Sequence, residues 1–135
     1  MENQEKAQKL YEEGLKEYEN ENYEKALKLF WEAAELGHVE AMIYLGEIYR
    51  DGKIVEQDGK AAIYWFEKFT DKRFEFDFEN ETLTYDINAI DGIEKEVLAA
   101  MKAMSEMYRD GNGVKQDERE SRFWIEEAKK IDSSI

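Results

Sequence analysis

The sequence of 135 residues contains no cysteine and no proline, and it has a single histidine. Without cysteine there is no disulfide and no thiolate zinc site. No stretch approaches the roughly 18 consecutive apolar residues of a membrane-spanning helix. The charged start MENQEKAQKL has no apolar run typical of a secretory signal. We therefore expect one soluble, cytoplasmic domain, residues 1–135, that binds no metal and no cofactor.

Positive charge is also scarce. Nineteen basic side chains oppose thirty-three acidic ones, which leaves a formal charge of −14. Such a protein repels phosphate backbones and anionic lipids, so we expect no nucleic acid and no membrane among its partners. A basic protein would be attracted to it. Eight tyrosines, seven phenylalanines and three tryptophans are present, and we expect these rings to fill much of the core.

Two segments that start 59 residues apart are alike. AMIYLGEIYRDGKIVEQDGKAAIYWFEK begins at Ala41, and AMKAMSEMYRDGNGVKQDERESRFWIEE begins at Ala100. With this constant offset YRDG falls on YRDG, and Trp65 falls on Trp124. A match of this length indicates an internal repeat.

A third copy lies upstream, because KALKLFWEAAELG aligns with KAAIYWFEKF at an offset of 35, which also places Leu10 on Leu45. The second step is 24 residues longer than the first, so repeat two is followed by an insertion. The predicted segments are repeat one at about 5–37, repeat two at about 38–70, the insertion at about 72–90 and repeat three at about 93–131.

Each repeat has the pattern of two α-helices. Ala41 and Leu45 belong to an apolar stripe at helical spacing in the first helix of repeat two. Asp58 and Asp117 are typical N-caps for the second helices of repeats two and three. Gly37 is placed to end the second helix of repeat one.

The pattern A-x3-L-G-x2-Y-x2-G, followed by V-x2-D and K-A-x3-W, resembles the Sel1-like repeat, which is related to the tetratricopeptide repeat. The matching residues in repeat two are Ala41, Leu45, Gly46, Tyr49, Gly52, Val55, Asp58, Lys60, Ala61 and Trp65. Those in repeat three are Ala100, Tyr108, Gly111, Gly113, Val114, Asp117 and Trp124. Repeat three departs at Met104-Ser105 and Glu120-Ser121. The resemblance implies an all-α, right-handed α/α superhelix and an adaptor or scaffold role.

The sequence offers little for catalysis. His38 stands alone just after Gly37, which favours a role at a helix cap or turn. The segment Asp110–Asp117 resembles the start of a calcium loop, but Val114 and Lys115 replace an oxygen ligand and an essential glycine. No nucleophile elbow or phosphate-binding loop is present. We expect that the protein is not an enzyme.

In stacked helical pairs the first helices line the concave surface, where partners usually bind. The candidate partner-binding residues are Gln8, Lys9, Glu12, Ile43, Tyr44, Glu47, Lys102, Ala103 and Glu106. Ile43 and Tyr44 would give this surface an apolar centre suited to a peptide or a helix. Alternatively, Tyr44 packs against the next repeat. Arg50 and Arg109 recur at equivalent places, so we expect each to bond a carboxylate or carbonyl at its turn.

The insertion RFEFDFENETLTYDI alternates apolar and polar residues, which predicts a small β-hairpin. Its candidate contact residues are Phe74, Phe76 and Phe78 on the first strand and Leu83, Tyr85 and Ile87 on the second. Glu79–Thr82 is the predicted turn, and 88–92 is expected to begin the next helix. The apolar face either packs on the helices or leaves an edge that pairs with another chain or a second copy.

These observations predict a non-catalytic protein–protein interaction module that binds a peptide or protein on its concave helical surface. The alternative is an acidic immunity or inhibitor protein that neutralises a basic partner. A homo-oligomer assembled through the inserted hairpin is a further possibility.

Overall fold

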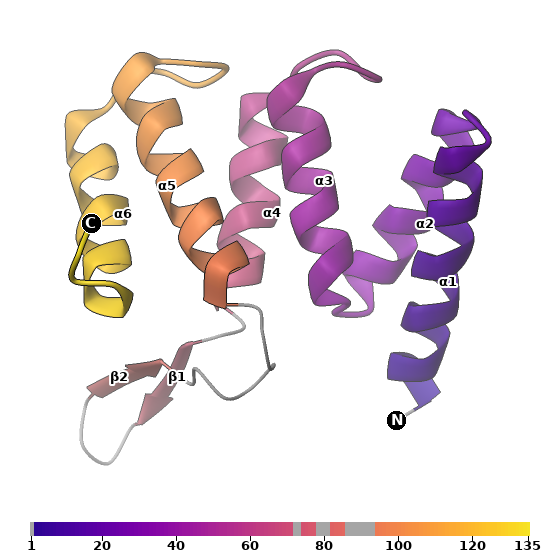
Figure 1. The fold of residues 1–135 in the computed structure, drawn as a ribbon, viewed down its shortest axis with the longest axis horizontal. Coiled ribbons are helices and arrows are strands. Elements are labelled where there is room, and N and C mark those ends of the chain that lie inside the picture. The colour runs from indigo at the N-terminus through magenta and orange to yellow at the C-terminus, as the bar shows by residue number, and fades with distance from the viewer. Residues whose placement is uncertain (1, 72–73, 78–81, 86–93) are drawn as a thin grey trace. The chain divides into compact units, whose positions relative to one another are not determined.

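Six α-helices and one pair of strands make up the part of the chain that the computed structural model describes, which is residues 2–71, 74–77, 82–85 and 94–135 (Figure 1). In chain order the elements are α1 (Glu2–Glu19), α2 (Tyr23–Glu35), α3 (Val39–Asp51), α4 (Gly59–Asp71), β1 (Phe74–Asp77), β2 (Thr82–Tyr85), α5 (Glu94–Asp110) and α6 (Glu118–Ile131). The chain divides into two compact units, Met1–Trp65 and Phe66–Ile135, and the division falls inside α4. The helical pairs confirm the all-α fold class.

Phe30 on α2 lies at the centre of the first unit and is completely buried. Its ring centroid is 5.8 Å from that of Tyr11 on α1 and 5.1 Å from that of Tyr44 on α3. Gly14 on α1 faces the same ring, because a Cβ placed there would lie 2.7 Å from Phe30 Cε1. The missing side chain therefore lets α1 approach α2 closely, and aromatic rings fill the space around the contact.

A second aromatic cluster joins α2 to the following repeat within the first unit. The indole N–H of Trp31 donates a hydrogen bond of 2.9 Å to the Tyr49 hydroxyl. The ring of Trp31 also meets that of Trp65 at a centroid distance of 4.7 Å in an edge-to-face arrangement. Aromatic side chains thus form much of the core, as the composition predicted.

Burial repeats with the same 59-residue offset as the sequence. The buried positions of α3 are Ala41, Met42, Leu45, Gly46 and Ile48. The residues 59 positions later, all buried in α5, are Ala100, Met101, Met104, Ser105 and Met107. Trp65 and Trp124 are likewise both buried, at 2% and 6% exposure. The correspondence between repeats two and three is confirmed.

The expected alignment of repeat one is wrong in part. Helix α3 ends 32 residues after α1 ends, whereas α4 begins 36 residues after α2 begins. A single offset of 35 therefore fits neither helix, because the turn inside repeat one has three residues and the turn inside repeat two has seven. Aligned at the helix ends, Gly14 corresponds to Gly46, and Leu10 is not equivalent to Leu45.

The expected helix ends are present. Asp58 Oδ1 accepts a hydrogen bond from the backbone N–H of Ala61, and Asp117 Oδ1 accepts from those of Arg119 and Glu120. These bonds satisfy donors that the first turn of a helix leaves without partners. Gly37 follows α2 with a φ of 96°, the left-handed conformation that favours glycine after a helix.

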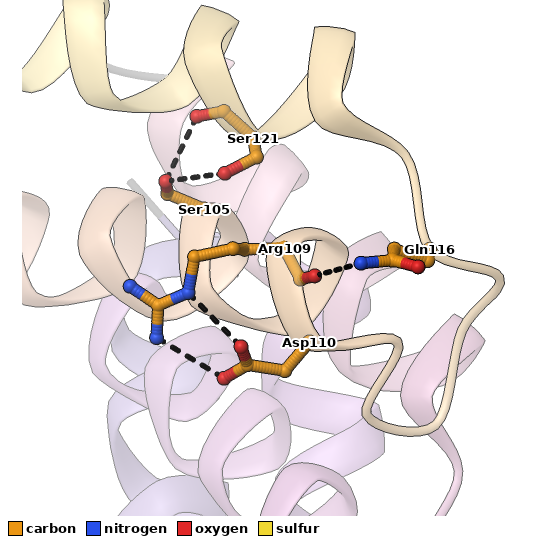
Figure 2. Close-up of polar contacts among 5 residues, drawn as sticks. All are labelled: Ser105, Arg109, Asp110, Gln116 and Ser121. Atoms are coloured by element: carbon orange, nitrogen blue, oxygen red, sulfur yellow. Dashed lines mark hydrogen bonds and ion pairs between the residues drawn. The ribbon is translucent and has the colours of Figure 1, made fainter.

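Repeat three departs from the repeat pattern at two pairs of residues, and the serine of one pair contacts the serine of the other. Ser105 stands where repeat two has Gly46, and Ser121 stands where it has Ala62. Ser105 Oγ donates to the Ser121 carbonyl oxygen at 2.8 Å and lies 3.1 Å from Ser121 Oγ (Figure 2). Repeat three thus places two hydroxyls at these positions, and hydrogen bonds between Ser105 and Ser121 link α5 to α6.

Strands β1 and β2 pair antiparallel between α4 and α5, with Phe74 opposite Tyr85 and Phe76 opposite Leu83. Thr82 belongs to β2 rather than to the turn, which corrects the predicted strand boundary. The predicted hairpin residues Phe78 and Ile87, the rest of the predicted turn, and the expected helix start at 88–92 lie outside the described residues.

The contact between Gly14 and Phe30 predicts that Gly14→Ala destabilises the protein. Alanine favours a helix by about 1 kcal/mol over glycine, but forcing a methyl group against a buried ring costs about 1–3 kcal/mol. We expect a net loss in the free energy of unfolding, measured by urea denaturation. Glu13→Ala, at an exposed position of the same helix, should change it by less than about 0.5 kcal/mol. A Gly14→Ala variant more stable than wild type would contradict the close approach.

The hydrogen bonds between Ser105 and Ser121 predict that substitutions at the two positions have non-additive effects on stability. Ser105→Ala removes the donor to the Ser121 carbonyl and should cost about 1 kcal/mol of unfolding free energy. Ser121→Ala removes only the hydroxyl–hydroxyl contact and should cost less. In urea denaturation the double variant should lose less than the sum of the two, with a coupling of about 0.5 kcal/mol or more. Strictly additive losses would show that the two hydroxyls do not interact in solution.

Candidate functional site

Tyr44 lies at the centre of the candidate surface in the first unit. Its ring contacts three others, those of Tyr11 and Tyr18 on α1 and Phe30 on α2, at centroid distances of 6.3, 5.9 and 5.1 Å. These residues belong to the preceding repeat. Tyr44 therefore packs against the repeat before it, and the alternative of packing against the next repeat stays a prediction. Tyr44 remains half-buried, so part of it is available to a partner.

The other candidate residues occupy three helices. In the first unit the exposed side chains are Gln8, Lys9 and Glu12 on α1 and Glu47 on α3, while Ile43 is half-buried. In the second unit Lys102 and Glu106 on α5 are exposed. Ala103 is buried at 6% exposure, so its expected place on the surface is wrong. Phe74, Phe76 and Tyr85 lie on the strands of the insertion. In the first unit, Tyr44 and Glu47 lie close enough for the carboxylate to raise the pKa of the phenol.

A pocket of about 180 Å³ lies beside Tyr44 in the first unit. Its lining residues are Tyr18 from α1, Tyr44, Glu47, Ile48 and Asp51 from α3, and Lys53 and Ile54 from the α3–α4 loop. We call this the Tyr18–Tyr44 pocket. Sequence reasoning found Tyr44 and Glu47 but missed the loop residues, because the spacing of a helix does not show where a following turn folds back.

A larger, open hollow of about 710 Å³ lies beside the α1–α2 turn. It is lined by Glu21–Lys25 and Lys28, which are almost consecutive in the chain. Such a hollow is the flank of a single turn, and it brings together no groups from separate elements. We therefore build the candidate site on the smaller pocket.

Carboxylates surround the aromatic rings of this surface. Burial, helped by Tyr44, Glu40 and Glu47, raises the pKa of Tyr11 to about 12. The pKa of Tyr44 is raised as well, first by burial and then by Tyr18, Glu47 and Glu19. Both phenols therefore keep their protons at neutral pH. The surface presents neutral hydroxyls and ring faces within a field of negative charge.

His38 caps the start of α3, as the sequence predicted. Its Nδ1 accepts a hydrogen bond from the Ala41 backbone N–H, and its Nε2 lies 2.8 Å from Gln8 Oε1 on α1. The ring stacks on Tyr11 at a centroid distance of 4.5 Å. A nitrogen that accepts carries no proton, so the imidazole is neutral with its hydrogen on Nε2. Burial lowers the pKa of His38, although Glu40 and Glu12 oppose that change.

Arg50 and Arg109 have the structural role that their repetition indicated. Arg109 holds Asp110 through two hydrogen bonds of 2.9 and 3.1 Å (Figure 2). In repeat two, Arg50 Nε donates to Asp51 at 2.9 Å. The turn that follows each arginine is held by a separate hydrogen bond from a glutamine side chain. Gln116 Nε2 donates to the Arg109 carbonyl oxygen at 2.7 Å, and Gln57 does the same to that of Arg50 at 2.8 Å.

Neither turn is arranged to hold a metal. In the segment that resembles a calcium loop, Asp110 is engaged by Arg109 and Asp117 caps α6. Among residues 2–71, 74–77, 82–85 and 94–135, no group of three potential metal ligands comes together. No helix in these ranges is both long and apolar enough to cross a bilayer.

Three consecutive matches relate the chain to a known repeat. The family model of the Sel1 repeat matches residues 7–38, 39–72 and 98–131. The chain belongs to the Sel1 repeat family. The matches leave out 73–97, which contains all but the first residue of the predicted insertion at about 72–90. Sel1 repeats generally mediate protein–protein interactions on a scaffold that is typically non-catalytic.

Solved structures show the same fold. A Sel1 repeat protein from Oxalobacter formigenes is similar over 92% of this chain, with a TM-score of 0.65 and 23% sequence identity. A protective antigen present in uropathogenic Escherichia coli strains, which displays an SLR fold, is similar over 92% with a TM-score of 0.62 and 28% identity. The chain spans 31% and 22% of the lengths of these two proteins. No curated protein matches it in sequence.

The neutral His38 cap predicts a pH-dependent stability in this Sel1 repeat chain. Because the folded-state pKa is below the unfolded value of about 6.5, the unfolded chain takes up the proton first as the pH falls. The stability contributed by the neutral ring is complete above the unfolded pKa and is lost as the pH falls through the folded pKa.

The measurement is urea unfolding of the wild type and of His38→Asn at about pH 7.5 and about pH 5. Asparagine can cap the helix but does not titrate. The wild type should lose more unfolding free energy than the variant between these two pH values. Equal losses would show that the ring is not held neutral by the fold.

Proposed function

We propose that this Sel1 repeat chain is a non-catalytic protein-interaction module that binds a peptide or protein on the first helices of its repeats. The observation that supports this most directly is the half-buried Tyr44, which lies beside a pocket and is flanked by exposed charged side chains. Aromatic anchors with a polar surround are typical of protein-binding surfaces. The family relationship supports the general role.

Each unit carries its own set of proposed binding residues. In the first unit they are Lys9, Glu12, Ile43, Tyr44 and Glu47, and in the second they are Lys102 and Glu106. The exposed members are charged and carry no recognisable catalytic arrangement. They suit recognition of a partner better than chemistry on a substrate.

A second candidate is an acidic inhibitor or immunity protein that neutralises a basic partner. The formal charge of −14 favours it, because complementary charge accelerates association and selects the partner. Its signature is a single basic partner whose activity is lost on binding, with binding that weakens steeply as salt is added. A homo-oligomer through Phe74, Phe76, Phe78 and Tyr85 of the insertion would instead appear as a stable assembly of the chain with itself.

The test is a comparative pull-down from the source cell with wild type and with Tyr44→Ala/Glu47→Lys. Partners bound through this surface should be lost with the double variant, because it removes the aromatic anchor and reverses a flanking charge. Glu47→Lys alone, at an exposed position, should reduce their recovery without disturbing the fold. Circular dichroism confirms that each variant is folded.

Glu126→Lys serves as the control, because it makes the same change of charge on α6, at an exposed position outside the proposed surface. It should recover the same proteins as the wild type. If the double variant also recovers them all, the first-helix surface is not where partners bind.

A further inference from the structure

The Tyr18–Tyr44 pocket has room for one side chain rather than for a whole ligand. Its volume of about 180 Å³ is below the roughly 300–1,000 Å³ of pockets that enclose small molecules. It opens between α1, α3 and the α3–α4 loop, next to residues of the proposed binding surface. A pocket of this size is typical of the anchor point for a single residue of a bound protein.

Its walls combine aromatic rings with negative charge. The rings of Tyr18 and Tyr44 meet edge to face, at an interplanar angle of 84°. Glu47 and Asp51 line the pocket from α3. A cation gains both from the face of an aromatic ring and from a carboxylate close by. An acidic or purely apolar side chain would gain from only part of this lining.

Positive charge is present at one end of the pocket. Lys53 lines it from the loop, and Asp51 is already engaged by Arg50. Glu47 lines the pocket next to Tyr44 and helps to raise the pKa of that phenol, so a cation against the Tyr44 ring lies close to this carboxylate. Glu19 on α1 adds negative charge near Tyr44. Changes at Glu47 and at Lys53 should consequently have opposite effects on a cationic ligand.

Repeat three shows that the fold does not require this lining. At the positions equivalent to Tyr44, Lys53 and Ile54 it has Ala103, Asn112 and Gly113. The α5–α6 loop nevertheless has the same length as the α3–α4 loop, and each is fastened by its glutamine. The ring of Tyr44 and the two loop residues are thus not dictated by the repeat structure, which favours a role in binding. The carboxylates Glu47 and Asp51 recur in repeat three as Glu106 and Asp110.

We infer that the Tyr18–Tyr44 pocket binds an arginine or lysine side chain from a basic segment of a partner protein. This inference rests on the proposed function and specifies the chemistry of the partner. The cationic group lies against the ring of Tyr44 and pairs with Glu47, while its aliphatic stem contacts Ile48 and Ile54. The negative charge of the whole chain attracts the basic segment, and the pocket then binds one of its cationic side chains.

The probe is a blocked nine-residue peptide in which three arginines are separated by glycines, observed through amide chemical shifts of the labelled protein. We expect saturable shifts at Tyr18, Tyr44 and Ile48. A lysine version should bind as well, more weakly, because the planar guanidinium stacks and pairs better than an ammonium group. Glutamate and leucine versions should not shift these amides. Failure of both cationic peptides to do so at millimolar concentration overturns the inference.

Charge variants separate the pocket from general attraction to an acidic protein. Glu47→Lys should weaken binding of the arginine peptide by about tenfold or more, because a like charge then faces the cation. Lys53→Glu should strengthen it by about threefold. Glu126→Lys changes the net charge as much as Glu47→Lys does, and it should have only a small effect. Equal weakening by these two glutamate variants would mean non-specific attraction and would overturn the inference.

Ring variants test the aromatic wall. Tyr44→Phe keeps the ring and should keep the peptide affinity within about twofold. Tyr44→Leu keeps an apolar side chain but loses the ring face, and it should weaken binding by about fivefold. Unchanged affinity in a folded Tyr44→Leu protein would exclude this wall as the contact.

The inference about the pocket and the proposed function can fail independently of each other. If the pull-down finds partners that depend on Tyr44 and Glu47 while the cationic peptides leave the pocket unchanged, the interaction role stands and the basic anchor is wrong. If the peptides bind as expected but no cellular partner depends on this surface, the pocket is real and the proposed role of the surface fails.

Discussion

The contact between Phe30 and the helices around it determines the arrangement of the first unit. The buried ring meets the bare backbone of Gly14 on one side and the rings of Tyr11 and Tyr44 on others. One side chain of α2 thus fixes how closely α1 and α3 approach it. The candidate surface depends on the same contact, because Tyr44 is held by Phe30 on its inner side and exposes the remainder beside the pocket.

Much of the fold could be predicted because its signals repeat within the chain. The 59-residue offset relates residues that the structure buries alike, and Trp65 and Trp124 are the clearest pair. Local signals were also sufficient for the caps at Asp58, Asp117 and His38, since a cap depends on a few neighbouring residues. The alignment of repeat one failed because a shorter turn changes the offset between its two helices.

The candidate site was less predictable, for a physical reason. Helical spacing indicated that Tyr44 and Glu47 share a face, but it could not show that the following loop brings Lys53 and Ile54 to the same pocket. Spacing also placed Ala103 on the surface, although the structure buries it. The hydrogen bond between Ser105 and Ser121 could not be predicted either. The sequence shows that each serine departs from the repeat pattern, but only tertiary packing brings the two together.

The fastened loops of repeats two and three have a consequence for how such a scaffold acquires new specificities. Each loop is held through a glutamine side chain, a backbone N–H and a capping aspartate, as at Gln57 and Asp58. The residues at the tip take no part in those bonds, and the two repeats differ there. Residues at the tip of the loop, which form one wall of the pocket, can therefore be substituted in evolution or by design while the helical framework stays in place.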